Sequence, residues 1–128
     1  MIHQDRLTAR IEGDFEELYQ HPELGFLHAE TWFSRTILVL QYWRSLDQLM
    51  DYAKNREAAH LPAWQAFNRS VGTDGSVGIW HETYSVSEGR HENVYVNMPA
   101  FGLGAAGTLV PARGGLQGAR GRMGQPDD

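Results

Sequence analysis

The clearest structural signal in this sequence is the segment Ile37-Leu38-Val39-Leu40-Gln41-Tyr42-Trp43. It is rich in β-branched, aromatic and aliphatic residues, a composition typical of a strand. Residues 25–33 before it also predict a strand, and Ser34-Arg35 supplies a turn between the two. We therefore expect an antiparallel hairpin over residues 25–44.

Helical patterns lie on both sides of this hairpin. Residues 14–20 have apolar side chains at helical spacing and end near His21-Pro22, where proline disfavours a continuing helix. After the hairpin, Ser45 is expected to be an N-cap, with Gln48 completing a capping box. A second helical piece is expected over residues 62–69, with Pro62 in its first turn.

Two further strands are expected at residues 77–86 and 93–98, which gives the order helix, strand, strand, helix, strand, strand. Helices on one face of an antiparallel sheet define the α+β class. The order fits a ferredoxin-like fold whose usual first strand is missing, because residues 1–12 contain no good strand. Such a sheet has an open edge that a second subunit would cover.

The length of 128 residues suits one domain, which we place at residues 1–103. Residues 104–128 hold half of the fourteen glycines and no aromatic residue, which predicts a flexible C-terminal tail. Residues 102–107 spell G-x-G-x-x-G, but Pro111 and Gly114-Gly115 follow where a nucleotide-binding helix should run. We interpret that match as chance.

Composition narrows the possible functions. The net charge of −5 argues against a nucleic-acid or anionic membrane partner. The absence of cysteine excludes disulfides, thiolate metal sites and cysteine nucleophiles. The N-terminus lacks the layout of a signal peptide, and the apolar run at residues 37–40 is too short to span a bilayer, so we expect a cytoplasmic protein.

Two histidines have contrasting neighbours. His60 has Trp64 at i+4 and Phe67 at i+7, so it either packs and bonds locally or is the axial ligand of a flat apolar cofactor such as haem. His81 shares a strand face with the apolar residues Val77 and Ile79, and is either a core or rim histidine or an acid–base group.

A third histidine, His28, shares a strand face with Phe26, Glu30 and Trp32. The pattern leaves open whether it lies in the core, at its rim or in a pocket. No nucleophile elbow, P-loop or glycosidase-like carboxylate pair occurs in the sequence.

Five motifs of the sequence stand out: HPELGFL at residues 21–27, QYWRS at 41–45, AHLPAW at 59–64, GIWHETY at 78–84 and VYVNMP at 94–99. Together they resemble a family of small bacterial and fungal monooxygenase-like proteins, of which a fungal member works in terpenoid natural-product biosynthesis. The resemblance covers about residues 15–104. A second pattern consists of a helical His60-Leu61, a strand with His81-Glu82 and a further strand with Tyr95-Val96-Asn97. This pattern is distantly similar to phenylacetaldoxime dehydratases, which are haem enzymes with a dimeric α/β-barrel fold.

The dehydratase resemblance implies that His60 is the axial ligand of the haem iron, beside Trp64 and Phe67, and that His81 is a distal acid–base group. The two resemblances together imply a homodimeric, haem-binding enzyme of secondary metabolism, with monooxygenase or aldoxime-dehydratase-like chemistry on a small apolar substrate. One alternative is a cofactor-independent monooxygenase in which His81, Asn97 or Trp43 polarises the substrate. Another is a non-catalytic ligand-binding or dimerisation module.

Overall fold

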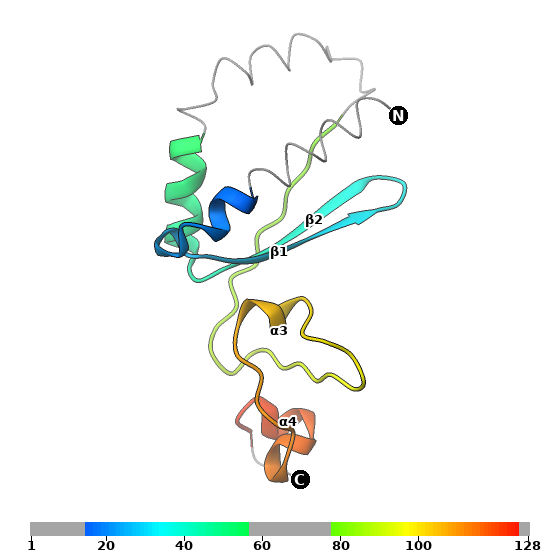
Figure 1. Ribbon diagram of the computed structural model, residues 1–128. Coiled ribbons are helices and arrows are strands. Elements are labelled where there is room, and N and C mark those ends of the chain that lie inside the picture. The colour runs from blue at the N-terminus through cyan, green and yellow to red at the C-terminus, as the bar shows by residue number, and fades with distance from the viewer. Residues whose placement is uncertain (1–14, 57–77, 126–128) are drawn as a thin grey trace.

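The computed structural model describes residues 15–56 and 78–125 and has an α+β architecture (Figure 1). Residues 15–19 and 46–56 are helical. The remaining elements are η1 (Pro22–Leu24), β1 (Phe26–Phe33), β2 (Ile37–Trp43), α3 (Leu103–Ala106), η2 (Gly114–Gln117) and α4 (Ala119–Arg122).

The predicted hairpin is confirmed. β1 and β2 pair antiparallel from Phe33 opposite Ile37 to Phe26 opposite Trp43, and the tight connection is closed by the amide of Ser34 on the carbonyl of Thr36, at 3.0 Å. The register shifts between Phe26 and His28, which adds one residue to β1 relative to β2. Such a bulge bends a strand and redirects its side chains.

The apolar core lies where the helix of residues 15–19 meets the base of the hairpin. Among the described apolar residues, only Leu18 and Phe26 are buried, at 3% and 4% exposure. The Phe26 ring stacks on Phe15 at 5.7 Å and meets Tyr19 and Trp43 edge-on at 4.9 and 5.5 Å. These contacts hold the helix against β1 and so fix where Tyr19 reaches.

The predicted N-cap at Ser45 is confirmed. Its Oγ accepts a hydrogen bond from the Gln48 amide at 3.2 Å, and its hydroxyl donates to Gln48 Oε1 at 3.0 Å. Gly25 has a φ of +92°, and a Cβ there would lie 2.4 Å from the Gln48 side chain. Glycine at position 25 therefore allows the start of this helix to lie against the base of the hairpin.

The strands predicted at residues 77–86 and 93–98 are wrong for the residues that the structure describes. Residues 78–100 contain neither helix nor strand, and the apolar side chains of Ile79, Tyr84 and Val96 are exposed. Alternating β-branched and aromatic residues favour a strand only where a neighbouring strand supplies hydrogen bonds. The described sheet therefore has two strands, fewer than the ferredoxin-like fold requires.

The sheet separates two sets of neighbours (Figure 1). The helix of residues 15–19 lies on one side, and α3 lies on the other, where the amide of Gly102 reaches Glu30. Residues 104–125 include η2 and α4, and Arg122 joins this region to Glu92 at 2.8 Å. Neither contact tests the domain boundary at residues 103 and 104, which stays a prediction.

Candidate active site

Three side chains at β1 form a continuous chain of hydrogen bonds. The Tyr19 hydroxyl lies 2.9 Å from His28 Nδ1, and His28 Nε2 lies 2.5 Å from Glu30 Oε1. His28 and Glu30 share a face of β1 because alternate strand residues do, whereas Tyr19 comes from the helix. We call this chain the Tyr19–His28–Glu30 relay.

The chemistry of the three groups fixes the direction of the relay. A carboxylate only accepts hydrogen bonds, so the hydrogen of a neutral His28 ring belongs on Nε2 and is donated to Glu30. The other ring nitrogen, Nδ1, then accepts from the Tyr19 hydroxyl. A tyrosine thus takes the place that serine has in a serine–histidine–carboxylate triad.

Backbone amides hold both ends of the relay. The amide of Ala29 donates to the Tyr19 oxygen at 3.2 Å, and the amide of Gly102 donates to Glu30 Oε1 at 3.3 Å. An N–H aimed at an oxygen stabilises negative charge that develops on it. Charge on either terminal oxygen of the relay is therefore stabilised by a fixed backbone donor.

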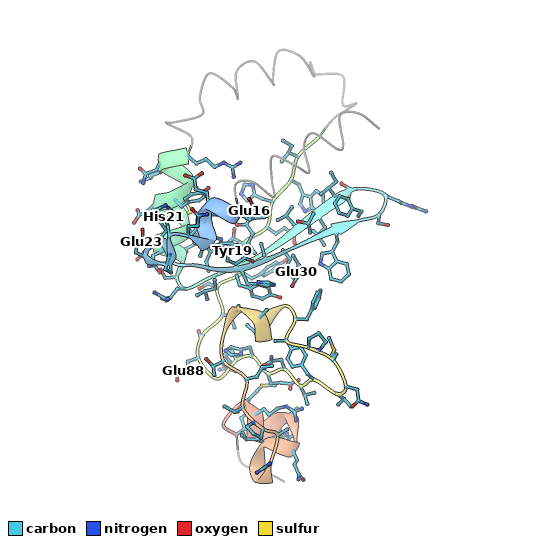
Figure 2. The ribbon with its side chains drawn as sticks, viewed as in Figure 1. Glu16, Tyr19, His21, Glu23, Glu30 and Glu88 are labelled. Carbon is cyan, nitrogen blue, oxygen red and sulfur yellow. The ribbon has the colours of Figure 1, made fainter. Side chains whose placement is uncertain are left out.

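The relay has a sheltered end and an accessible end. The side chains of His28 and Glu30 are 20% and 19% exposed, whereas Tyr19 is 48% exposed. Figure 2 shows Glu30 on the side of β1 that faces α3, whereas Tyr19 lies at the end of the helix of residues 15–19. A bound molecule would therefore meet the relay at the Tyr19 hydroxyl.

A groove of about 390 Å³ opens beside Tyr19, within the usual size range of small-molecule sites. It lies between the helix of residues 15–19 and the β1 face opposite His28 and Glu30. Its lining residues are mostly apolar or aromatic: Phe15, Glu16, Tyr19, Ala29, Thr31 and Phe33. The groove suits a small, largely apolar molecule that presents one polar atom to Tyr19.

Tyr42 lies across the hairpin from His28, with the ring centroids 6.3 Å apart. Burial raises the pKa of the Tyr42 hydroxyl, and the neighbouring Tyr95 and Glu30 raise it further. Tyr42 therefore stays protonated at neutral pH and adds no charge beside the relay.

A second groove, of about 370 Å³, runs between the two helices and η1, and its lining includes Glu17, His21, Glu23 and Asp51. Its His21–Glu23 pair is 3.0 Å apart and well exposed. A hydrogen bond from its own backbone, followed by one from His21, lowers the pKa of Glu23. This groove contains no relay residue, so we place the candidate site at Tyr19.

The site residues predicted from the sequence have different outcomes. His60, Trp64 and Phe67 lie outside the described residues. His81 is exposed, in a segment without helix or strand, and Asn97 is exposed in a left-handed conformation with a φ of 55°. Neither side chain hydrogen-bonds to another described residue, so roles for all five stay predictions.

Trp43, the third group considered for polarising a substrate, is already engaged. Its indole N–H donates to Gln41 Oε1 at 2.9 Å. The relay was not predicted from the sequence, although the spacing of His28 and Glu30 places them on one strand face. No sequence pattern predicts that Tyr19 contacts His28, because this contact depends on how the helix of residues 15–19 packs on β1.

Within residues 15–56 and 78–125, no group of three or more histidine or acidic residues could hold a metal ion. Within the same part, no helix is long and apolar enough to cross a membrane.

A protein-family model and a curated relative that match this chain carry the same monooxygenase af470 description. The family model described as monooxygenase af470-like matches residues 2–103. Monooxygenase af470 of Aspergillus fumigatus is 28% identical over 132 aligned positions, which cover 86% of this chain and 46% of the relative. The chain thus spans about half the length of that relative. No solved structure matches the chain.

Proposed function

The chain belongs to the monooxygenase af470-like family, and from this membership we propose that it oxidises a small apolar substrate bound in the groove beside Tyr19. The observation that carries the proposal is the Tyr19–His28–Glu30 relay, whose outer member, Tyr19, is half-exposed and lines an aromatic groove. The monooxygenase role comes from the family, and the residues that perform it come from the geometry.

The relay suits a substrate that must lose a proton before it reacts with O₂. As the Tyr19 hydroxyl passes its proton to His28 Nδ1, the Tyr19 oxygen takes one from the substrate. The resulting imidazolium lies against the Glu30 carboxylate, and the Ala29 amide stabilises charge on Tyr19. Phenols, enols and ketones with an acidic methylene group are the substrate classes that need this step.

Such a substrate supplies all the electrons that the oxidation requires. The carbanion formed from an activated methylene group reduces O₂, and the carbon becomes a carbonyl. One oxygen atom enters the product, and the other leaves as water with the two hydrogens of the methylene group. The proposed reaction therefore needs no added cofactor or reductant.

The test uses aromatic ketones with an activated methylene group and isotopically labelled O₂. We expect O₂ uptake and one labelled oxygen atom in the product. Tyr19→Phe removes the hydroxyl and keeps the ring that packs on Phe26. It should lower kcat by roughly 100-fold or more, the usual contribution of general acid–base catalysis.

Tyr84→Phe is the matched control. The Tyr84 hydroxyl bonds to Glu82 and is exposed, so its loss should leave kcat unchanged. The proposal fails if Tyr19→Phe oxidises the ketones as fast as the parent protein. An absence of O₂ uptake across the series would instead favour a non-catalytic binding module.

Haem on His60 is the competing proposal that the dehydratase resemblance suggests. His60, Trp64 and Phe67 lie outside the described residues, and His81 is exposed and meets no described aromatic ring. An absorption spectrum of protein produced with ample haem tests it. An intense Soret band that His60→Ala abolishes, with activity lost in the same variant, would replace the cofactor-independent scheme.

We also propose that the functional unit is a homodimer with the ferredoxin-like, dimeric α/β-barrel arrangement. Within residues 15–56 and 78–125, β1 and β2 pair only with each other, and apolar side chains such as Ile79, Trp80 and Val96 are exposed. Both features support this proposal, because a second copy would cover them. Light scattering should give twice the monomer mass. A monomer at all concentrations would contradict the proposal without affecting the relay.

A further inference from the structure

The two glycines that begin the G-x-G-x-x-G match lie in the crowded turn that starts α3, Gly102 at its N-cap and Gly104 within its first turn. Gly102 and Gly104 are both buried. Gly102 has a φ of +57°, and a Cβ there would lie 3.1 Å from the Tyr42 hydroxyl. A Cβ on Gly104 would lie 2.7 Å from the Tyr95 hydroxyl. The positive φ favours glycine at position 102, and the close approach of the Tyr95 ring favours it at position 104.

Tyr95 closes this turn through its hydroxyl group. Its oxygen accepts a hydrogen bond from the Gly104 amide at 2.8 Å, and its hydrogen is donated to the carbonyl of Phe101. The Phe101 ring in turn meets Trp32 of β1 edge-on at 5.7 Å. One side chain thus bridges both ends of the turn, and an aromatic contact holds the turn on the sheet.

The Gly102 amide, between these two attachments, donates to Glu30 Oε1. This is the same oxygen that accepts from His28 Nε2. A carboxylate that receives two donors on one oxygen has less freedom to rotate than one that receives a single donor. The turn therefore helps to orient the Glu30 carboxylate, which in turn orients the His28 ring.

We propose that Tyr95 is a positioning residue for the relay, because it fixes the turn whose Gly102 amide orients Glu30 toward His28. This inference rests on the proposed function for its effect on catalysis. The hydrogen-bond geometry that it asserts does not depend on any reaction. The G-x-G pair serves here to bring backbone close to two tyrosines and a carboxylate.

The test compares Tyr95→Phe with Tyr84→Phe in the full chain. Both variants lose one tyrosine hydroxyl, but only Tyr95 bonds to the turn. We expect Tyr95→Phe to lower kcat roughly 10-fold to 100-fold with little change in KM, because a small misplacement of a catalytic group slows chemistry more than binding. Tyr84→Phe should match the parent protein.

A spectroscopic readout separates positioning from a merely structural role. In the parent protein, the His28 Nε2–H proton should give a distinct downfield NMR signal, since it is donated to a carboxylate. That signal should broaden in Tyr95→Phe and persist in Tyr84→Phe. Gly104→Ala, which pushes on the Tyr95 ring, should reproduce the broadening by an independent route.

The outcomes distinguish the two proposals. An unchanged His28 signal in both Tyr95→Phe and Gly104→Ala overturns the positioning role, whatever their activity. If the signal broadens as expected while Tyr19→Phe remains fully active, the positioning role stands and the proposed function fails.

Discussion

At the scale of single residues, the candidate site depends on the number of hydrogen bonds that each group can make. His28 uses both ring nitrogens, and Glu30 Oε1 accepts from a side chain and a backbone amide. Partly sheltered groups that are fully hydrogen-bonded cost little to keep. Removing one member leaves its partner unsatisfied, which costs about 1–3 kcal/mol when that partner is buried.

Tyr42 gives a prediction about alkaline pH. Its pKa lies above 10.0 in the folded protein, mainly because of burial, and near 10.0 in the unfolded chain. The folded state thus keeps a proton that the unfolded state loses. The contribution of Tyr42 to stability is fully present below about pH 10 and is lost as pH rises through the folded-state pKa of Tyr42.

Tyr42→Phe should therefore lose less stability than the parent protein between about pH 9 and pH 11. Thermal unfolding across this range measures the difference. Tyr84 is a useful comparison, because the hydrogen bond to Glu82 raises its pKa while its ring is exposed. Solvent screening should make the effect of Tyr84→Phe smaller. Equal slopes for the parent and Tyr42→Phe would contradict the assignment.

At the scale of elements, one small aromatic cluster joins the helix of residues 15–19 to the hairpin. Phe26 is its centre, with Phe15, Tyr19 and Trp43 around it. Because Tyr19 belongs to this cluster, the packing that stabilises the fold also places the accessible end of the relay. Core and site therefore depend on the same contacts.

Phe26→Ala should destabilise the protein by about 3–5 kcal/mol, since truncating a buried phenylalanine loses apolar burial and leaves a cavity. Urea unfolding measures this loss. Phe33→Ala is the control on the same strand, because Phe33 is 56% exposed, and its effect should be under about 1 kcal/mol. Similar losses in the two variants would contradict a core centred on Phe26.

At the scale of the whole molecule, the two-stranded sheet leaves residues 78–100 without a strand partner in the described chain. The amides of residues 78–86 donate no hydrogen bond to a described backbone group, whereas β1 and β2 are paired along their lengths. In the proposed dimeric barrel, by contrast, residues 78–86 would form a hydrogen-bonded strand.

Hydrogen exchange at several protein concentrations measures whether the amides of residues 78–86 are hydrogen-bonded. In dilute monomer, the amides of residues 78–86 should exchange much faster than those of β1, because unbonded amides are unprotected. Protection that appears only where the mass doubles would indicate pairing in a dimer. Protection equal to that of β1 in the monomer would instead mean that these residues join the sheet of their own chain.

The hairpin, the helix cap at Ser45 and the family could all be predicted from the order of the amino acids. Each of these depends on neighbours in the chain: strand composition on both sides of a turn, a serine three residues before a glutamine, and contiguous motifs. Interactions of this range are local, so the residue pattern specifies them before the chain is folded.

The three-dimensional arrangement was needed to find the relay and to show that residues 78–86 have no strand partner in the described chain. Tyr19 reaches His28 because the helix packs on Phe26, and Gly102 reaches Glu30 from 72 positions further along the chain. Strand-like residues 78–86 remain unpaired for the same reason: a strand requires a partner whose position is set by packing. Long-range contacts depend on the fold, and no local pattern encodes them.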